Sequence, residues 1–446
     1  MTRSERATAE PIVAAAQLAG LRGRVLLHSA RDDDGLGRYS FVAAEPTATL
    51  IARGRSLVEL DAAGRPARRF TGDPFEAAEQ FLAAHGCELA ATAGDRAAPP
   101  VPRVIGYLGY DLARVVETLP GGPALGADVP DLWLGAYDAV ARFGPARELV
   151  GEPAAVARLA GWLDRRPARP LGVPPSLGPL ASDDDGAHHV ARVGRVLDYL
   201  AAGDVYQVCL ARRLVARVAA PGDALALYAA LADVAPAPYG ALLELDGLAV
   251  ISGSPERFLA RTGDRIETRP IKGTRPRAPG AGAELAASPK DAAEHLMIVD
   301  LERNDLGRVA EVGSVSVDEL GYVVELPALF HKVSRVSARP RAGTGYASLL
   351  RATFPGGSIT GAPKVRAMQL IDELEPARRG PYCGALGYFG AAGFDLAIAI
   401  RIGVLTAGEL RVHVGGGVVA DSLPEAELAE TDDKAAGWRA ALASLS

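Results

Sequence analysis

Residues 257–277 read RFLARTGDRIETRPIKGTRPR. The pattern predicts two strands, 257–261 and 265–269, joined by a tight turn at Thr262-Gly263-Asp264. The second strand leads into PIKGTRPR at 270–277, a loop that holds one lysine, Lys272, flanked by Arg269, Arg275 and Arg277. Positive neighbours disfavour the charged form of a lysine and lower its pKa, which an amine nucleophile requires. A solvated basic loop explains the same octamer, so both interpretations stay open at this point.

Glu256 stands just before the first strand of this hairpin. With Asp264 taken as the middle of the turn, Glu256 lies eight residues before it and Lys272 eight residues after it. Both therefore lie at the same end of the hairpin, where directly opposed Cβ atoms are about 5 Å apart. A change of one residue in the turn would place the two side chains on opposite faces, so the pattern supports nearness without deciding the register.

The composition is that of an ordinary globular protein with a large core. Of the 446 residues, 49% are hydrophobic and 23% are charged, and the length favours two units. The net charge of −6 comes without a basic block, which excludes a typical nucleic-acid-binding protein. Three distant cysteines and the lack of a transmembrane-length apolar run or signal segment favour a cytoplasmic protein with no membrane association.

The chain divides into a first unit at 1–165, a Pro-rich linker at 166–186 and a second unit at 187–446. The linker prediction rests on five prolines followed by the polar run DDDG. In the first unit the sequence predicts strands at 24–29, 39–43 and 104–110, a hairpin at 49–60 and a helix capped by Asp73.

The second unit holds most of the polar detail. It opens with a helix from 187, followed by the strand candidate YQVCLARRL at 206–214, and a hairpin turns at Asp246-Gly247. Ser288-Pro289 predicts the start of a helix that runs to near Gly307 and carries Glu294 beside its buried stripe. Taken alone, Glu294 is better explained as a surface carboxylate in a salt bridge.

Residues 354–364 read FPGGSITGAPK and form a Gly-rich loop before a helix predicted at 363–374. The loop is not a P-loop, because Ala362 follows Gly361, and not a nucleophile elbow, because Thr360 stands where a second glycine is needed. The free N–H groups at the start of such a helix favour an anion.

A further hairpin is predicted at 394–419, turning at Ala407-Gly408. Pairing across that turn sets Arg401 beside Val414, next to the run Gly415, Gly416 and Gly417. A guanidinium beside glycine amides makes a cradle for a carboxylate. A glycine kink with a surface arginine is the alternative.

The last helix is predicted from Pro424. Glu427, Glu430 and Lys434 follow at spacings of three and four residues, so they share one face. Two carboxylates without a nearby histidine or cysteine suit a hard cation such as Mg²⁺. A Glu–Lys salt bridge on a solvated helix explains the same pattern.

Taken together and in this order, these segments resemble the chorismate-utilising enzymes. The resemblance rests on YQVCLARRL, SPERFL, PIKGTRPR, EHLMIVDLERNDLGR, FPGGSITGAPK, PYCGALGYFG, AIAIR, GGGVVADS and ETDDKA, which span 187–446, and on GRYSF and GYLGYD in the first unit. It implies an α/β (α+β type) fold of two large, mostly antiparallel sheets packed face to face, with helices outside and the active site between the sheets.

The resemblance also implies roles for individual residues. Lys272 would be the nucleophile and Glu256 the general acid, helped by His331. Chorismate would be held by Gln207, Thr360, Tyr382, Arg401, Gly415, Gly416, Gly417 and Lys434. The Mg²⁺ ion would be bound by Glu294, Glu427 and Glu430. Members that add water to chorismate usually carry a lysine base at the position of Gln207, and an amide cannot act as that base.

Within the family, PIKGT distinguishes subgroups. Anthranilate synthases usually carry alanine at the position of Lys272, whereas the members that aminate chorismate at C4 carry lysine. The resemblance therefore implies synthesis of 4-amino-4-deoxychorismate for 4-aminobenzoate and folate, with ammonia from a separate glutamine amidotransferase subunit in a heterodimer. An anthranilate synthase component I, or a catalytically silent subunit that binds chorismate or an amino acid, are the alternatives.

Overall fold

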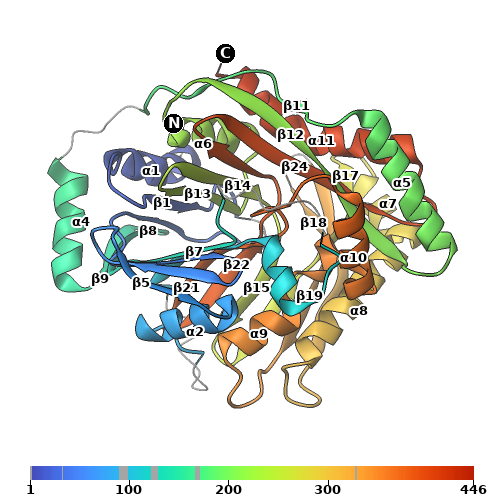
Figure 1. The fold of residues 1–446 in the computed structure, drawn as a ribbon, viewed down its shortest axis with the longest axis horizontal. Helices are drawn as coiled ribbons and strands as arrows, with labels where there is room; N and C mark the ends of the chain where they lie inside the picture. The colour runs from blue at the N-terminus through green and yellow to red at the C-terminus, as the bar shows by residue number, and fades with distance from the viewer. Residues whose placement is uncertain are drawn as a thin grey trace.

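The computed structural model describes residues 3–32, 34–89, 99–121, 129–165, 171–326 and 329–445. Two large sheets form the centre of the molecule, and helices cover them from outside (Figure 1). Every strand pair recorded within these two sheets is antiparallel. The predicted fold class is thereby confirmed.

The first sheet contains the long strands that carry the glycine run. Its order is β10 (Ser176–Leu177), β12 (Gln207–Ala220), β24 (Glu409–Val418), β23 (Ile402–Thr406), β14 (Leu248–Ser254), β13 (Tyr239–Leu245), β1 (Val25–His28), β2 (Ser40–Ala43), β8 (Ala139–Phe143) and β9 (Arg147–Gly151). Two short strands, β11 (Ala181–Ser182) and β20 (Gly361–Ala362), also pair with β12.

The second sheet contains the hairpin that leads to Lys272. Its order is β17 (Ile271–Pro276), β19 (Leu329–Ala338), β16 (Arg265–Arg269), β15 (Arg257–Thr262), β22 (Gly393–Ile398), β21 (Ala385–Gly390), β6 (Val104–Leu108), β7 (Leu132–Ala136), β3 (Ala48–Arg53), β4 (Ser56–Leu60) and β5 (Pro66–Thr71). Strand β18 (Ser316–Glu325) pairs with β19.

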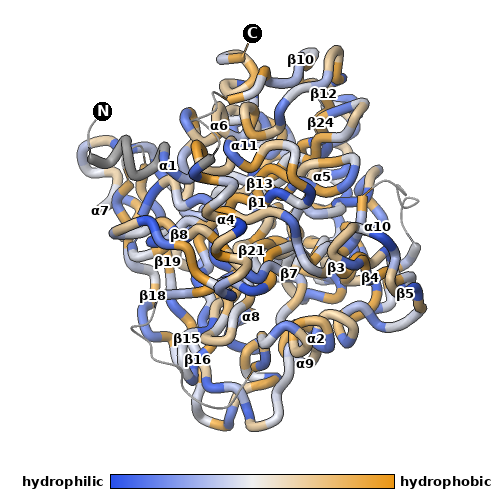
Figure 2. Tube along the Cα trace, turned by 90° about the vertical axis from the view of Figure 1, so that its left-hand side faces the viewer, coloured by the Kyte–Doolittle hydropathy of each residue, from blue (hydrophilic) through white to orange (hydrophobic). Residues whose placement is uncertain are grey.

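The main core lies between the two sheets. Phe41 of β2 in the first sheet meets Tyr388 of β21 in the second, with ring centroids 5.3 Å apart. Hydrophobic segments run through the middle of the molecule, around β1 and β13 (Figure 2). Burial of these apolar faces, rather than any single polar contact, holds the two sheets together.

Helices pack on the outer faces of both sheets. The first sheet is covered by α1 (Arg3–Gln17), α4 (Pro153–Arg165), α5 (Gly186–Ala201), α6 (Ala224–Val234) and α11 (Pro424–Ala443). The second sheet contacts α2 (Pro74–Ala84), α7 (Ala281–Ala287) and α8 (Pro289–Gly307), with α9 (Tyr346–Thr353) against α2 and α8. The short α3 (Ala113–Val116) follows the 3₁₀ turn η1 (Tyr110–Leu112), and α10 (Lys364–Leu374) packs on β12 and β20.

Local sequence signals placed most of these elements. Asp73 caps α2 by accepting hydrogen bonds from two backbone N–H groups, and Ser288 caps α8 by accepting one from the Asp291 N–H. The tight hairpins at Asp246-Gly247 and Ala407-Gly408 are present as predicted. These features depend on neighbours along the chain, which explains why the pattern predicts them.

Strands from both predicted units enter both sheets. β1 pairs with β13, and β6 pairs with β21, across the predicted linker. Within that linker, residues 166–170 lie outside the described residues, while β10 and β11 pair with β12 rather than running free. The boundaries 1–165, 166–186 and 187–446 stay predictions about the organisation of the chain.

Candidate active site

Two crossings of the chain between the sheets lie side by side and carry the first two site residues. Glu256 lies where the chain passes from β14 to β15, and Arg401 lies where it passes from β22 back to β23. The Gly253 N–H donates to the Arg401 carbonyl at 3.1 Å, and the Ile398 N–H donates to the Glu256 carbonyl at 3.0 Å. The general-acid candidate and the carboxylate-binding candidate therefore lie on adjacent backbone segments.

The crossing at Arg401 corrects one prediction. Residues 394–419 do not form a single hairpin, because the chain leaves the second sheet after Ile398 and enters the first at Ile402. Arg401 adopts the left-handed backbone conformation at this bend, with φ of 53°. The β23–β24 pair nearest to Arg401 is Gly403 with Val412, so the placement of Arg401 beside Val414 stays a prediction.

Glu256 and Lys272 lie at the same end of their hairpin, as the count predicted. A bulge shifts the β15–β16 register between Arg257 and Ala260, so the pairing ends with Arg257 opposite Arg269. As a result the Ile271 N–H, not the Lys272 side chain, donates to Glu256 Oε1, at 3.3 Å. Burial raises the pKa of the Glu256 carboxyl, and the nearby Lys272 partly offsets this rise. A carboxyl with a raised pKa can hold a proton for a leaving group.

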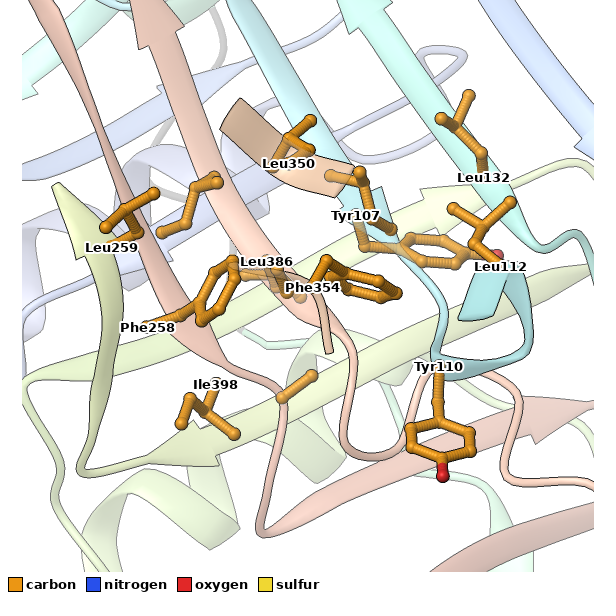
Figure 3. Close-up of a cluster of buried hydrophobic side chains, with 14 of the residues drawn as sticks. Tyr107, Tyr110, Leu112, Leu132, Phe258, Leu259, Leu350, Phe354, Leu386 and Ile398 are labelled. Carbon is orange, nitrogen blue, oxygen red and sulfur yellow. The ribbon is translucent and has the colours of Figure 1, made fainter. Parts of the chain in front are cut away.

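The Gly-rich loop reaches Lys272 from the other side. Phe354 anchors the start of the loop, with its ring edge-on to Phe258 at a centroid distance of 6.1 Å (Figure 3). The loop continues through the 3₁₀ turn η2 (Gly357–Ile359), and Lys272 Nζ donates to the Ser358 carbonyl at 3.2 Å. Lys272 is partly buried, so its amine is held between the loop and Glu256.

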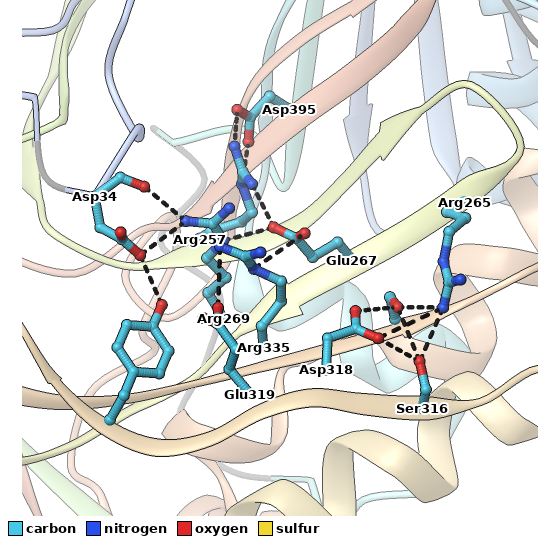
Figure 4. Close-up of polar contacts among 12 residues, drawn as sticks. Asp34, Arg257, Arg265, Glu267, Arg269, Ser316, Asp318, Glu319, Arg335 and Asp395 are labelled. Carbon is cyan, nitrogen blue, oxygen red and sulfur yellow. Dashed lines mark hydrogen bonds and ion pairs between the residues drawn. The ribbon is translucent and has the colours of Figure 1, made fainter. Parts of the chain in front are cut away.

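The three arginines around Lys272 do not supply unpaired positive charge. Arg269 pairs with Glu267 at 2.6 Å (Figure 4), Arg275 with Asp291 at 2.6 Å, and Arg277 with Glu325 at 2.6 Å. Each guanidinium is compensated by a carboxylate. The partners of Arg275 and Arg277 come from α8 and β18, so the octamer alone does not reveal this compensation.

His331 of β19 pairs with Thr274 of β17, two residues after Lys272. The Thr274 hydroxyl and His331 Nδ1 form a hydrogen bond of 2.9 Å. Burial, followed by the charges of Arg31 and Arg401, lowers the pKa of His331 to about 4. His331 is therefore a neutral imidazole near pH 7, suited to orienting a proton donor rather than to donating as an imidazolium.

The Arg401 guanidinium makes no hydrogen bond or ion pair with any residue in the described part of the chain. The side chain is exposed, yet surrounding protein atoms desolvate it and lower its pKa. Such a group is open to solvent on one side and enclosed on the others. An uncompensated guanidinium in this position favours an anionic ligand.

The glycine run lies at a partly open edge of β24. Gly415, Gly416 and Gly417 pair with β12 on one side, whereas β23 pairs only as far as Val412 on the other. A Cβ atom at residue 417 would lie 3.1 Å from Gln207 Nε2, so the buried Gln207 amide packs directly over this glycine. The run therefore leaves room for side chains to approach the strand backbone.

Two carboxylates of α11 lie close to this strand, and Glu294 of α8 is near enough for their charges to interact. A Cβ atom at Gly416 would lie 2.8 Å from Glu427 Oε2 and 3.4 Å from Glu430 Oε1. Burial raises the pKa of Glu427 and of Glu294, and the charge of Glu430 raises both further. The charges of Glu294 on α8 and of the two glutamates of α11 therefore interact. The sequences of α8 and α11, taken separately, do not predict this interaction.

The donor set fits a hard divalent cation. Glu427 Oε1 accepts a hydrogen bond from Ser422 at 2.6 Å, but its buried Oε2 has no hydrogen-bond partner among the described residues. Mg²⁺ is bound in proteins through carboxylate oxygens. A buried carboxylate oxygen without a hydrogen-bond partner is therefore a candidate ligand. As they stand, no three His, Cys, Asp or Glu side chains of the described residues are close enough to complete a metal site by themselves.

The remaining predicted ligands are engaged in internal contacts. Lys434 Nζ donates to the Gly415 carbonyl at 2.6 Å and pairs with Glu430 at 2.6 Å, so the Glu–Lys alternative is also realised. The buried Thr360 hydroxyl donates to the Gly356 carbonyl at 3.0 Å. Tyr382 stacks on His413, and its burial raises its pKa. These contacts place all three beside the site residues described above.

The sequence analysis missed two residues that support the Gly-rich loop. Glu302 of α8 is buried, and its Oε1 accepts the Gly357 N–H at 3.1 Å. Cys209 of β12 donates its thiol to the same Ser358 carbonyl that Lys272 uses, at 3.3 Å. The periodicity of α8 places Glu302 on its buried face, and that signal could have identified it.

Residues 27–439 match the family described as chorismate binding enzyme, and the chain belongs to this family. It is an enzyme of the chorismate-utilising type. In the part of the chain that the structure describes, no helix is long and apolar enough to cross a membrane.

Two curated relatives and one solved structure define its neighbours. "Aminodeoxychorismate synthase component 1" of Klebsiella aerogenes is 42% identical, covering 92% of this chain and 91% of that protein. "Anthranilate synthase component 1" of Streptomyces coelicolor is 38% identical, covering 94% and 84%. The crystal structure of anthranilate synthase component I from Streptococcus pneumoniae TIGR4 has a TM-score of 0.78 at 27% identity, covering 90% of this chain and 92% of that chain.

Proposed function

We propose that the chain is the synthase component of an aminodeoxychorismate synthase, which converts chorismate and ammonia to 4-amino-4-deoxychorismate. The observation that carries this proposal is the placement of Lys272 beside the buried Glu256, with its amine held at the Ser358 carbonyl. A lysine next to a protonated acid provides a nucleophile and a leaving-group acid in one site. The relatives named aminodeoxychorismate synthase component 1 support the same assignment.

Chorismate is a dicarboxylate, and the site offers positive and N–H groups for it. Arg401 lacks a partner among the described residues and would bind one carboxylate, with the amides of Gly415–Gly417 and Lys434 beside it. Gln207, Thr360 and Tyr382 would line the same space. Direct contact of these groups with the substrate is part of the proposal.

The proposed reaction has two displacement steps. In the first, the Lys272 nitrogen, once deprotonated, forms a bond to C2 of the ring, the C4–O bond breaks as the ring double bonds shift, and Glu256 protonates the departing hydroxyl to water. Neutral His331 would orient this proton. In the second, ammonia forms a bond to C4, the double bonds shift back, the C2–N bond to Lys272 breaks, and the new ammonium group returns a proton to the Glu256 carboxylate. The enolpyruvyl group stays on the product, so a separate lyase must form 4-aminobenzoate.

Glu294, Glu427 and Glu430 would hold Mg²⁺, in keeping with the orphaned Glu427 oxygen. When bound, the ion neutralises substrate carboxylate charge and orients the ring. Without the ion the three glutamates repel one another. Burial raises the pKa of Glu294 and of Glu427, and the charge of Glu430 raises both pKa values further.

Ammonia would come from a glutamine amidotransferase subunit in a heterodimer. None of Cys87, Cys209 and Cys383 stands in a Gly-x-Cys-x-Gly elbow that a glutaminase nucleophile would use. Two of them, Cys87 and Cys383, are buried thiols whose pKa values burial raises to about 12, which makes them poor nucleophiles. The relatives' designation as component 1 agrees with a second component.

An anthranilate synthase is the alternative, because relatives of that name are nearly as similar. Trapping the lysine separates the two. Incubation with chorismate and Mg²⁺ but no ammonia, followed by acid quenching and peptide mass analysis, should show Lys272 carrying the mass of chorismate minus one water. The Lys272→Ala variant should carry no adduct and should lose 4-amino product or divert to anthranilate. A wild-type rate of 4-amination in the Lys272→Ala variant would refute the role of Lys272 as the nucleophile.

A further inference from the structure

The hairpin that leads to Lys272 brings two arginines directly opposite each other. Arg257 begins β15, Arg269 ends β16, and the register pairs them across the strands. Their side chains are only 13% and 11% exposed. Like charges directly opposite in an antiparallel pair repel, and burial weakens the screening by water and salt. The open end of this hairpin therefore needs an anion between the strands.

Glu267 provides that anion. One oxygen, Oε1, accepts from Arg257 Nη1 at 2.7 Å and from Arg269 Nε at 2.6 Å, so a single carboxylate oxygen bridges both guanidiniums (Figure 4). The other oxygen lies 3.6 Å from Arg335 Nε. Charge-assisted bonds of this kind are short and directional, so they set the distance between the two strands.

The bridged arginines are the immediate neighbours of the two reacting groups. Glu256 directly precedes Arg257, and Pro270 and Ile271 separate Arg269 from Lys272. The Ile271 N–H donates to Glu256 Oε1 at 3.3 Å, which links the two segments just beyond the arginine pair. The outer sides of the arginines are also held, Arg257 by the Asp395 carboxylate at 2.7 Å and Arg269 by the Asp34 carbonyl at 3.0 Å and the Asp34 carboxylate at 3.5 Å. The arginine pair therefore lies directly beside the segments that carry the acid and the amine.

We propose that Glu267 is a positioning residue for the reaction, which holds the Glu256 and Lys272 segments together by bridging Arg257 and Arg269. This inference rests on the proposed function for the roles of Glu256 and Lys272. Glu267 touches neither group, and its effect passes through the two arginines.

The test is Glu267→Gln, which keeps the shape of the side chain and removes its charge. Without the anion the arginines repel, and a displacement on the order of 1 Å costs about 100-fold in rate. We expect kcat for chorismate consumption to fall about 30- to 100-fold, while KM for chorismate changes less than about threefold, because Arg401 and the glycine run are untouched. Asp318→Asn is the matched control, since Asp318 pairs with Arg265 at the turn end of the same hairpin. It should lower the melting temperature without lowering kcat.

A compensating variant separates charge bridging from general stability. In Glu267→Gln/Arg269→Gln one of the repelling charges is gone, so kcat should recover to within about tenfold of wild type. If the single variant fails to fold, the double variant carries the test alone. The proposal is overturned by wild-type kcat in a folded Glu267→Gln protein, by equal losses in the Asp318→Asn control, or by a double variant without recovery. All rates are chorismate consumption, whichever product forms, so product identity tests the proposed function separately.

Discussion

Replacing Gly416 by alanine should weaken Mg²⁺ binding without disturbing the fold. A methyl carbon there would lie 2.8 Å from Glu427 Oε2 and 3.4 Å from Glu430 Oε1. Ordinary contacts begin at 3.4 Å, so the Glu427 carboxylate must shift by about 0.6 Å while Glu430 stays. Mg²⁺ demands near-ideal octahedral geometry, and displaced supporting groups typically cost 10- to 100-fold in metal affinity. We expect the Mg²⁺ dissociation constant to rise about tenfold.

The assay is calorimetric titration of Mg²⁺, repeated as the Mg²⁺ dependence of chorismate consumption. Gly408→Ala is the control, because a Cβ atom at this turn of the same hairpin meets nothing within 4 Å. The control should bind Mg²⁺ like the wild type, and both variants should keep melting temperatures close to it, since the clash is with the far end of a flexible side chain. Unchanged Mg²⁺ affinity in a folded Gly416→Ala protein would show that Glu427 is not a ligand.

Two further perturbations follow from the same geometry. Arg401→Gln should raise KM for chorismate about 10- to 100-fold, because a charge-assisted hydrogen bond to a carboxylate contributes about 1.5–3 kcal/mol. Arg439→Gln, on the exposed side of α11, is the control. An unchanged KM in the Arg401→Gln variant would show that Arg401 does not bind the substrate. Burial and the charge of Asp305 raise the pKa of Glu302 from 4.5 to about 8. Between these two pH values the folded chain holds a proton on Glu302 that the unfolded chain releases. The free energy of unfolding therefore falls as pH rises through this range. The slope of the free energy of unfolding against pH is at most about 1.4 kcal/mol per pH unit for one group, and Glu302→Gln should flatten it. The measurement is thermal unfolding from pH 5 to 8. Identical slopes in the wild type and the variant would contradict a raised pKa of Glu302.

Features set by neighbouring residues could be predicted from the sequence. The caps at Asp73 and Ser288 and the turn at Ala407-Gly408 follow from short-range rules.

Features set by contacts between distant segments could not be predicted. The bulge between Arg257 and Ala260 changes which atom faces Glu256, and no residue of RFLAR signals it. Arg275 pairs with Asp291 of α8 and Arg277 with Glu325 of β18, so the octamer 270–277 could not show that its charges are compensated. The approach of Glu427 to Gly416 depends on how α11 lies across β24.

The most direct measurement of the central claim is the identity of the product. The purified chain, incubated with chorismate, Mg²⁺ and ammonium at alkaline pH, should consume chorismate and form 4-amino-4-deoxychorismate. The account predicts that 4-aminobenzoate appears only when an aminodeoxychorismate lyase is added. Fluorescent anthranilate forming without the lyase would contradict the account and assign the chain to the ortho-aminating branch of its family.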